Sequence, residues 1–259
     1  MIPGPDLPRW GIVFEAWRVV IENSGAALRV AFLPFLILLA MHRLVDVVAP
    51  TGFQAIGWQL VHVVVFPIPA ALLLVPWYRL IVSAQRPELA SPPARWWYVA
   101  FMIRTLGLEL MLFASQIPSM VASIMAVADG GAPDPELARL ALMFFLVALA
   151  PGFYLYARAG LALPAAACGD DDSYGRSWRV TGGAGWRVAG IVFTVWMMFF
   201  IVGLMLAGAP PEGAATAPPV FFDAVISAAI DVVRELAMAA ALALVYLHYR
   251  RTPVQDVFS

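Results

Sequence analysis

The sequence has no lysine, one cysteine and few charged residues of either sign. Only 13% of its 259 residues are charged, about half the share in soluble domains, whereas 62% are hydrophobic and the mean hydropathy is +0.83. So few polar side chains cannot cover a water-soluble domain, and the composition therefore predicts a membrane protein. The single Cys168 excludes an internal disulfide and a cysteine-rich metal site, and we expect it to be a small buried side chain.

Signatures of several other functions are missing as well. The sixteen basic residues are all arginines spread along the whole chain, whereas a nucleic-acid binder needs a concentrated basic face. The sequence contains no His-Glu-x-x-His metal motif, no phosphate-binding Gly-Lys-Ser/Thr loop and no Gly-x-Ser-x-Gly nucleophile elbow. We therefore expect no enzyme, no cofactor, no metal and no nucleic acid. A weak metal or proton site at His42, Asp46 and His62 is the alternative to isolated interfacial histidines.

Long apolar runs are what the sequence has in abundance. A helix needs about 20 mostly apolar residues to cross the hydrocarbon core, and six such runs alternate with breaks rich in Pro, Gly and acidic residues. They cover residues 26–48, 55–83, 97–127, 136–166, 184–208 and 219–249. The pattern predicts an all-α fold, a single polytopic membrane bundle of six transmembrane helices over residues 1–259. Pro67, Pro69 and Pro76 predict a kink in the second helix.

Arginine positions predict the orientation of this bundle. With the N-terminus inside, thirteen arginines fall in or beside the cytoplasmic segments, Arg43 and Arg139 fall outside, and Arg234 lies within a span. An excess of positive charge marks the cytoplasmic side, so we expect both termini to be cytoplasmic. The first residues lack a basic stretch followed by an apolar one, so the first span is expected to act as the insertion signal.

Short segments with Trp and Arg precede the inward starts of the odd-numbered spans. Residues 10–22 place their apolar side chains on one helical face, which predicts an amphipathic interfacial helix over residues 7–23. The stretch SYGRSWRVTGGAGWR repeats this layout and predicts a second interfacial helix over residues 172–182. The expected lipid anchors are Trp17, Arg18, Arg176, Trp178, Arg179, Trp186 and Arg187. The similarity between the segments reflects either common recruitment of anchors or a true repeat of three helical hairpins.

Residues 154–193 resemble the signature stretch of the YciC-like bacterial membrane proteins and of the membrane domain attached to some glycerophosphodiester phosphodiesterases. Residues 14–28 resemble the amphipathic segment that precedes the first span in the same proteins. The matching positions are Arg158, Pro164, Asp170, Ser177, Trp178, Thr181, Gly182 or Gly183, Trp186 and Arg187. Where the family tends to have Glu, this chain has three Asp. The resemblance implies a six-helix fold in the bacterial inner membrane. It implies no reaction, because the phosphodiesterase activity belongs to a separate soluble domain.

Polar side chains inside the predicted spans are costly and mark a protein interface or a cavity. In the third span they follow one helical face, and in the sixth they cluster around Arg234. These positions are Thr105, Glu109, Gln116, Ser119 and Ser123, then Ser227, Asp231, Arg234 and Glu235. We expect an intramembrane polar network, which comprises Arg104, Glu109, Gln116, Arg158, Asp231, Arg234 and Glu235. It either holds the third, fourth and sixth spans together by ion pairs or lines a cavity for a solute, ion or proton.

These expectations favour a non-catalytic membrane protein, either an accessory or scaffold subunit of a membrane complex or a factor of membrane homeostasis. The alternative is a small transporter or lipid-handling protein that uses the buried charges. The expected partners are membrane lipids, anionic ones included, and a partner protein or a second copy of the chain. Small residues near the end of the sixth span, Ala237, Ala240 and Ala241, are the candidate contact between copies.

Overall fold

The protein is all-helical throughout the part of the chain that its computed structural model describes, residues 9–48, 53–84, 92–126, 135–170, 174–207 and 220–251. The helices are α1 (Arg9–Glu22), α2 (Ser24–Val48), α3 (Phe53–Val65), α4 (Pro67–Ser83), α5 (Arg95–Ala126), α6 (Pro135–Gly160), α7 (Ala162–Ala167), α8 (Tyr174–Val180), α9 (Gly185–Ala207) and α10 (Val220–Arg251). The all-α class expected from the apolar runs is therefore confirmed. The predicted second span divides into α3 and α4 at Phe66, directly before Pro67, the first of the prolines that predicted a kink.

Five helical segments are long and apolar enough to cross a membrane. They are Ser24–Val45, Ile56–Ser83, Arg95–Met125, Arg139–Ala167 and Gly185–Gly203. The sixth expected span forms α10, a helix of 32 residues, but α10 is not among the five candidates. This helix contains Asp231, Arg234 and Glu235 within about one turn. The described residues thus contain five candidate membrane helices, and the sixth predicted span is not confirmed.

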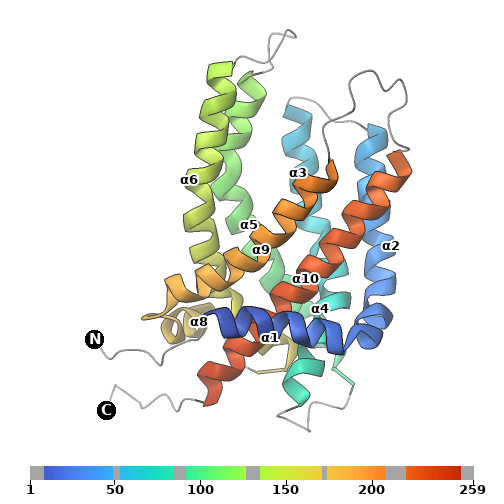
Figure 1. The fold of residues 1–259 in the computed structure, drawn as a ribbon, viewed down its shortest axis with the longest axis vertical. Helices are drawn as coiled ribbons and strands as arrows, with labels where there is room; N and C mark the ends of the chain where they lie inside the picture. Colours follow the sequence, from blue (N-terminus) through green and yellow to red (C-terminus); the bar gives the residue numbers. More distant parts are fainter. Residues whose placement is uncertain are drawn as a thin grey trace.

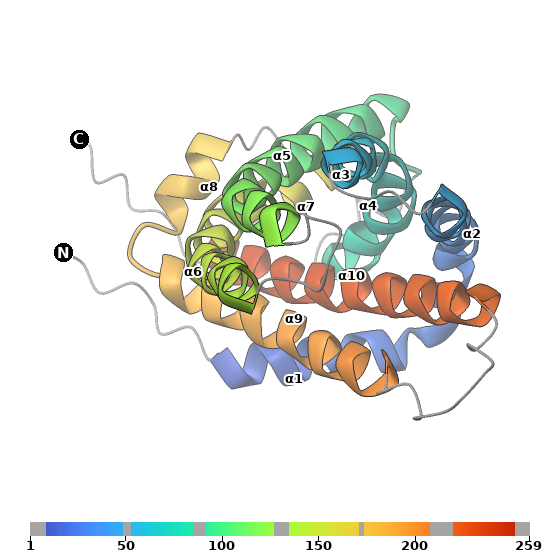
Figure 2. The same cartoon turned by 90° about the horizontal axis from the view of Figure 1, so that it is seen from above.

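The helices fall into an upright group and a crossing group. Figure 1 shows α2, α5 and α6 running along the long axis, while α9 and α10 cross them at a slant and α1 lies across one end. Seen from above, α10 passes between α1 and α9 on one side and α4 and α7 on the other (Figure 2). The start of α1 and the end of α10 lie at the same end of the molecule, together with α8 (Figure 1).

The C-terminal half of α10 forms the centre of the core. From Leu236 to Leu247 nearly every side chain is buried, and the indole Nε1 of Trp77 in α4 donates to the Leu236 carbonyl at 3.0 Å. Ala237, Ala240 and Ala241 are fully buried within the chain. The expected contact between two copies through these alanines is therefore wrong, because α10 uses its small residues to pack against its own neighbouring helices.

A short buried helix closes the end of the bundle where α1 and α8 lie. α6 ends at Gly160 instead of continuing through the predicted span, and α7 packs against α4, α5 and α10. Every side chain from Leu161 to Cys168 is buried, which confirms the expected burial of Cys168. The chain then leaves α7 through Gly169, whose φ of +74° lies in the left-handed region that glycine adopts readily.

Replacing Gly169 by alanine is expected to destabilise the protein by about 2 kcal/mol or more. A Cβ atom at this position would lie 2.5 Å from Cζ2 of Trp97, in addition to the cost of positive φ for a residue with a side chain. Gly57→Ala is the matched control, since nothing lies within 4 Å of a Cβ there. Thermal unfolding in detergent measures both, and equal midpoints for the two variants would contradict the expected clash.

Candidate functional site

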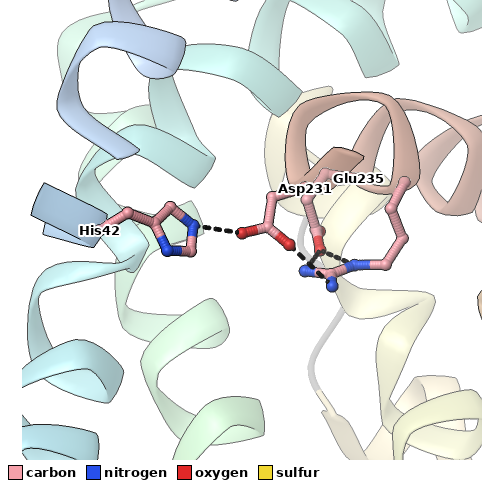
Figure 3. A network of polar contacts seen from close by, with 4 residues as sticks. His42, Asp231 and Glu235 are labelled. Atoms are coloured by element: carbon pink, nitrogen blue, oxygen red, sulfur yellow. Dashed lines mark hydrogen bonds and ion pairs between the residues drawn. The ribbon is translucent and has the colours of Figure 1, made fainter. Parts of the chain in front are cut away.

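Four side chains from α2 and α10 form a connected polar cluster, shown in Figure 3. Nε2 of His42 lies 2.9 Å from Oδ2 of Asp231. Arg234 then bridges the two acids of its own helix, with Nη1 at 2.9 Å from Oδ1 of Asp231 and Nη2 at 3.2 Å from Oε1 of Glu235. Residues three apart face the same side of a helix, which explains the Asp231–Arg234 pair. We call His42, Asp231, Arg234 and Glu235 the polar cluster.

Two further ionisable side chains face the polar cluster from other helices. Glu109 of α5 interacts electrostatically with Glu235 and Arg234, and His62 of α3 with Asp231, His42 and Arg234. Neither makes a hydrogen bond with another residue in the described ranges. Four helices thus contribute charge to one region, which contains three carboxylates, one guanidinium and two imidazoles. With all three acids ionised and both histidines neutral, the region would carry a net charge of −2.

The polar cluster is not sealed inside the protein. The exposed fraction of the side chains is 32% for His42, 18% for Asp231, 26% for Arg234 and 12% for Glu235. Glu109 and Gln116 of α5 are also only partly buried. The charged groups are therefore partly accessible at the surface, while the other end of the bundle is filled by α7.

Arg104 and Arg158 do not join this cluster, which corrects the predicted network. Nη1 of Arg104 donates to the Ala162 carbonyl at 3.2 Å, and Arg158 binds α8. The physical reason is that α6 ends two residues after Arg158, so its guanidinium lies at the end of the bundle instead of at the depth of Arg234. Gln116 is engaged within its own helix, since its side-chain Oε1 accepts a hydrogen bond from Ser119 at 3.3 Å.

Arg158 instead holds α8 onto α6. Its guanidinium donates to the Trp178 carbonyl (2.5 Å), the Gly182 carbonyl (3.5 Å) and the Tyr154 hydroxyl (2.9 Å), and lies 4.2 Å from the centre of the Trp178 ring. In return the Ser177 hydroxyl donates to the Arg158 carbonyl at 2.6 Å. A positive charge at the C-terminal carbonyls of a helix is favourable. Four of the residues quoted for the family resemblance therefore lie in direct contact, namely Arg158, Ser177, Trp178 and Gly182.

A glycine makes this arrangement possible. A Cβ at Gly185 would lie 2.6 Å from Cδ of Arg158 and 2.9 Å from Cε2 of Tyr154, so only glycine leaves room for the arginine stem. The next residue, Trp186, packs its ring 4.6 Å from that of Tyr154. Gly185, the first residue of α9, therefore lets α9 approach α6 closely.

Three more arginines fix the segment around α7. Arg79 donates to the Ala167 carbonyl at 3.3 Å and lies 4.6 Å from the Trp97 ring centre, and Arg104 holds Ala162 as described. Arg250, near the end of α10, lies 2.6 Å from Oδ2 of Asp170. The Tyr246 hydroxyl donates to the same carboxylate oxygen. Helices α4, α5, α6 and α10 therefore each contribute one arginine that contacts α7, α8 or the residues that directly follow them.

The predicted lipid anchors divide into two groups. Trp17 stacks on Phe199 of α9 at 5.3 Å and thus packs inside the protein rather than in lipid, and Arg18 pairs with Glu15 (2.5 Å) and Glu22 (3.7 Å) on its own helix. The other positions lie on α8 and the start of α9. Of these, Arg176, Trp178, Arg179 and Trp186 are exposed and Arg187 is partly buried.

Sequence reasoning missed the pairing of His42 with Asp231. The two residues are 189 positions apart, and His42 was considered with Asp46, whose side chain lies outside the described residues, and with His62. Their predicted positions offered a signal, because the first span leads outward and the sixth leads inward, so both residues fall in the outer halves. In the part of the chain that the structure describes, no three His, Cys, Asp or Glu side chains are grouped as metal ligands would be.

Removing the Tyr174 hydroxyl is expected to change how stability depends on alkaline pH. This hydroxyl donates to the Arg104 carbonyl, and burial raises the pKa of Tyr174 from 10 to about 12, with Arg104 opposing the shift. Because the folded-state pKa is the higher one, the neutral phenol contributes stability fully below pH 10 and loses that contribution as pH rises towards 12. The stability difference between wild type and Tyr174→Phe should shrink over this window; a constant difference would contradict the assignment.

Comparisons of the chain with protein-family models, curated proteins and solved structures found no match. The resemblance of residues 154–193 to the YciC-like proteins therefore rests on the quoted residues alone.

Proposed function

We propose that the chain crosses the bacterial inner membrane six times, with α10 as the sixth span, α1 and α8 at the cytoplasmic interface and both termini inside. Packing supports this placement, because α10 contacts α2, α4 and α9. Each of these three helices forms all or part of a candidate membrane span. Exposed side chains support it as well, because α1 turns Trp10, Phe14 and Ile21 outward on one face while Ile12, Val13 and Ala16 are buried on another. The YciC-like resemblance agrees with this topology.

We further propose that the protein is a small transporter whose polar cluster binds a proton or a small cation from the outer side. The observation that carries this proposal is the exposure of Arg234 and Asp231, 26% and 18%, at helix positions that would lie within the membrane. Charged groups do not face hydrocarbon without a large cost, so the exposed parts require water or a ligand. The bundle is closed at the opposite end by α7.

The charge inventory supports a positive ligand. Glu109, Asp231 and Glu235 face a single Arg234, and an uncompensated charge in a medium of low polarity is strongly unfavourable. Protons on the histidines or acids, or a bound monovalent cation, restore the balance. A neutral or anionic solute would leave the excess negative charge in place.

A scaffold or accessory subunit is the second candidate function. It is favoured by the ion pairs themselves, because His42–Asp231 ties α2 to α10 and each partner of Arg234 is satisfied. In that case the polar cluster only fastens helices, and water has no reason to reach it. The two functions therefore make different predictions about water: a transporter requires it between the outer halves of α5 and α10, and a scaffold does not.

Thiol labelling in intact membranes tests the transporter proposal. Gln116→Cys places a thiol two turns outward from Glu109 on the polar face of α5, and a charged, membrane-impermeant thiol reagent added outside should modify it. Val147→Cys is the control, since Val147 is 67% exposed on α6 but would face lipid, where such a reagent does not react. The wild-type chain with its buried Cys168 gives the background. If Gln116→Cys is as unreactive as Val147→Cys, the result contradicts the transporter proposal and favours the scaffold function.

A further inference from the structure

Glu109 differs from the two acids of the polar cluster, because it has no ion-pair partner among the described residues. Asp231 pairs with Arg234 and with His42. Glu235 pairs with Arg234 as well. Two charged groups interact electrostatically with Glu109, and the carboxylate of Glu235 does so more strongly than the guanidinium of Arg234. An ionised Glu109 would therefore lie beside a charge of its own sign.

The position of Glu109 in α5 makes an uncompensated charge costly. The residue lies near the middle of the candidate span Arg95–Met125 and is flanked in the sequence by Leu108 and Leu110. A carboxylate that leaves water without a partner is strongly unfavourable, and such a group takes up a proton instead. Protonation of Glu109 is therefore the least costly way for this region to lose negative charge.

The oxygens around Arg234 are arranged for a proton rather than for a metal cation. The guanidinium engages Oδ1 of Asp231 and Oε1 of Glu235, so it occupies the position from which a cation would use these ligands. Nε2 of His42 engages Oδ2 of Asp231. No three His, Cys, Asp or Glu side chains are grouped as metal ligands would be in the described ranges. A proton, in contrast, needs a single carboxylate oxygen.

Two hydroxyl groups can serve the protonated form of Glu109. Thr105 lies one turn before it on α5, and the Thr105 Oγ1 atom is buried without a hydrogen bond to any described residue. Tyr156 of α6 is buried, interacts electrostatically with Glu109 and makes no hydrogen bond within the described part of the chain. Residues four apart on a helix are neighbours. A protonated Glu109 thus has an acceptor within reach on its own helix.

The ionisable groups that face Glu109 come from α10 and α6, although α3, α4 and α7 also pack against α5. His62 of α3 faces the polar cluster, and α7 has no ionisable residue. In α4, Tyr78 faces Glu235, and Arg79 is directed to the Ala167 carbonyl. The groups that act on the proton of Glu109 are therefore Glu235, Arg234 and Tyr156.

We propose that the transported ion is a proton and that the carboxylate of Glu109 binds it, while Asp231, Arg234 and Glu235 stay charged. One proton joins one carboxylate oxygen, and the region loses one negative charge. The inference rests on the transporter function proposed above and names its ion. The two can fail separately, because labelling of Gln116→Cys reports water, whereas the test below reports the protonation of Glu109.

A hydrophobic carbodiimide tests this proposal on the intact protein in lipid bilayers. Such a reagent modifies carboxylic acids but not carboxylates: the carboxyl oxygen bonds to the central carbon of the carbodiimide, the proton passes to a nitrogen, and rearrangement leaves a stable N-acylurea. Peptide mapping of wild type at neutral pH should find at least tenfold more adduct on Glu109 than on Asp231 or Glu235. The adduct on Glu109 should decrease as the pH is raised.

Two variants serve as controls. Glu109→Gln should lose the adduct, whereas Glu22→Gln removes an exposed acid paired with Arg18 and should leave the labelling of Glu109 unchanged. Val147→Glu adds a carboxyl to a side chain position that is 67% exposed on α6 and would face lipid, so its adduct shows that the reagent reaches the membrane interior. The main result comes from wild type and does not require that Glu109→Gln folds.

Three outcomes would overturn the proposal. An adduct at position 147 of Val147→Glu without one on Glu109 of the same molecule would show that Glu109 is ionised. Equal labelling of Asp231 or Glu235 would show that the proton is not specific to Glu109. Protection of Glu109 by sodium or potassium ions at constant pH would show that the region binds a metal cation in place of a proton.

Discussion

Replacing Arg234 by glutamine is expected to lower the free energy of unfolding by about 2 to 4 kcal/mol. The substitution removes the only guanidinium that pairs with Asp231 and Glu235 in the polar cluster and leaves their carboxylates beside Glu109. Loss of one partner of a buried ion pair costs about 3–5 kcal/mol, and the quarter of the Arg234 side chain that is exposed reduces this figure.

Unfolding in mixed micelles with increasing SDS measures this loss. Arg18→Gln removes an exposed arginine with two acidic partners and should change the free energy by less than about 1 kcal/mol. Combining Arg234→Gln with Asp231→Asn should recover part of the stability, since it removes one of the stranded charges. A similar small change for both single variants would show that the polar cluster contributes nothing to the fold.

Replacing Arg158 by methionine is expected to free α8 from α6. The variant keeps an apolar stem but loses the hydrogen bonds to the Trp178 and Gly182 carbonyls and to the Tyr154 hydroxyl. A hydrogen bond from a charged group contributes about 1.5–3 kcal/mol. A local loss of about 3 kcal/mol corresponds to roughly a hundredfold rise in the opening of this segment.

Trypsin reports this opening, because Arg176 and Arg179 lie within α8 and are cleaved only when the helix opens. Peptides that end at these two residues should appear roughly a hundred times faster in Arg158→Met than in wild type. Arg158→Lys keeps the charge but cannot bridge both carbonyls, so it should lie between them. Unchanged cleavage in Arg158→Met would mean that α8 is held by other contacts.

The helices were predictable because apolar runs and their breaks are local features of the sequence. The break before Pro67 and the helical face of α1 follow from residue spacing alone. The end of α6 at Gly160 was not predictable, since the following Leu161–Cys168 is as apolar as a span and becomes α7 only through its packing against α4, α5 and α10. The length of an apolar run does not show where the chain turns.

The candidate site was predictable only within one helix. Asp231, Arg234 and Glu235 are close in sequence, so their pairing follows from helical periodicity. The partner His42 and the destination of Arg158 depend on how α2 and α6 approach other helices. Residue spacing within α6 could not show that α8 folds back over Arg158.

In the proposed topology, α10 crosses the membrane with its charged residues inside. Single cysteines near its two ends test this most directly in intact cells, with Asp223→Cys on its exposed first turn and Arg250→Cys on its last. We predict that an impermeant thiol reagent added outside modifies Asp223→Cys at once and Arg250→Cys only after the membrane is permeabilised. Modification of both positions from the same side would contradict the six-span arrangement and the membrane location of the polar cluster.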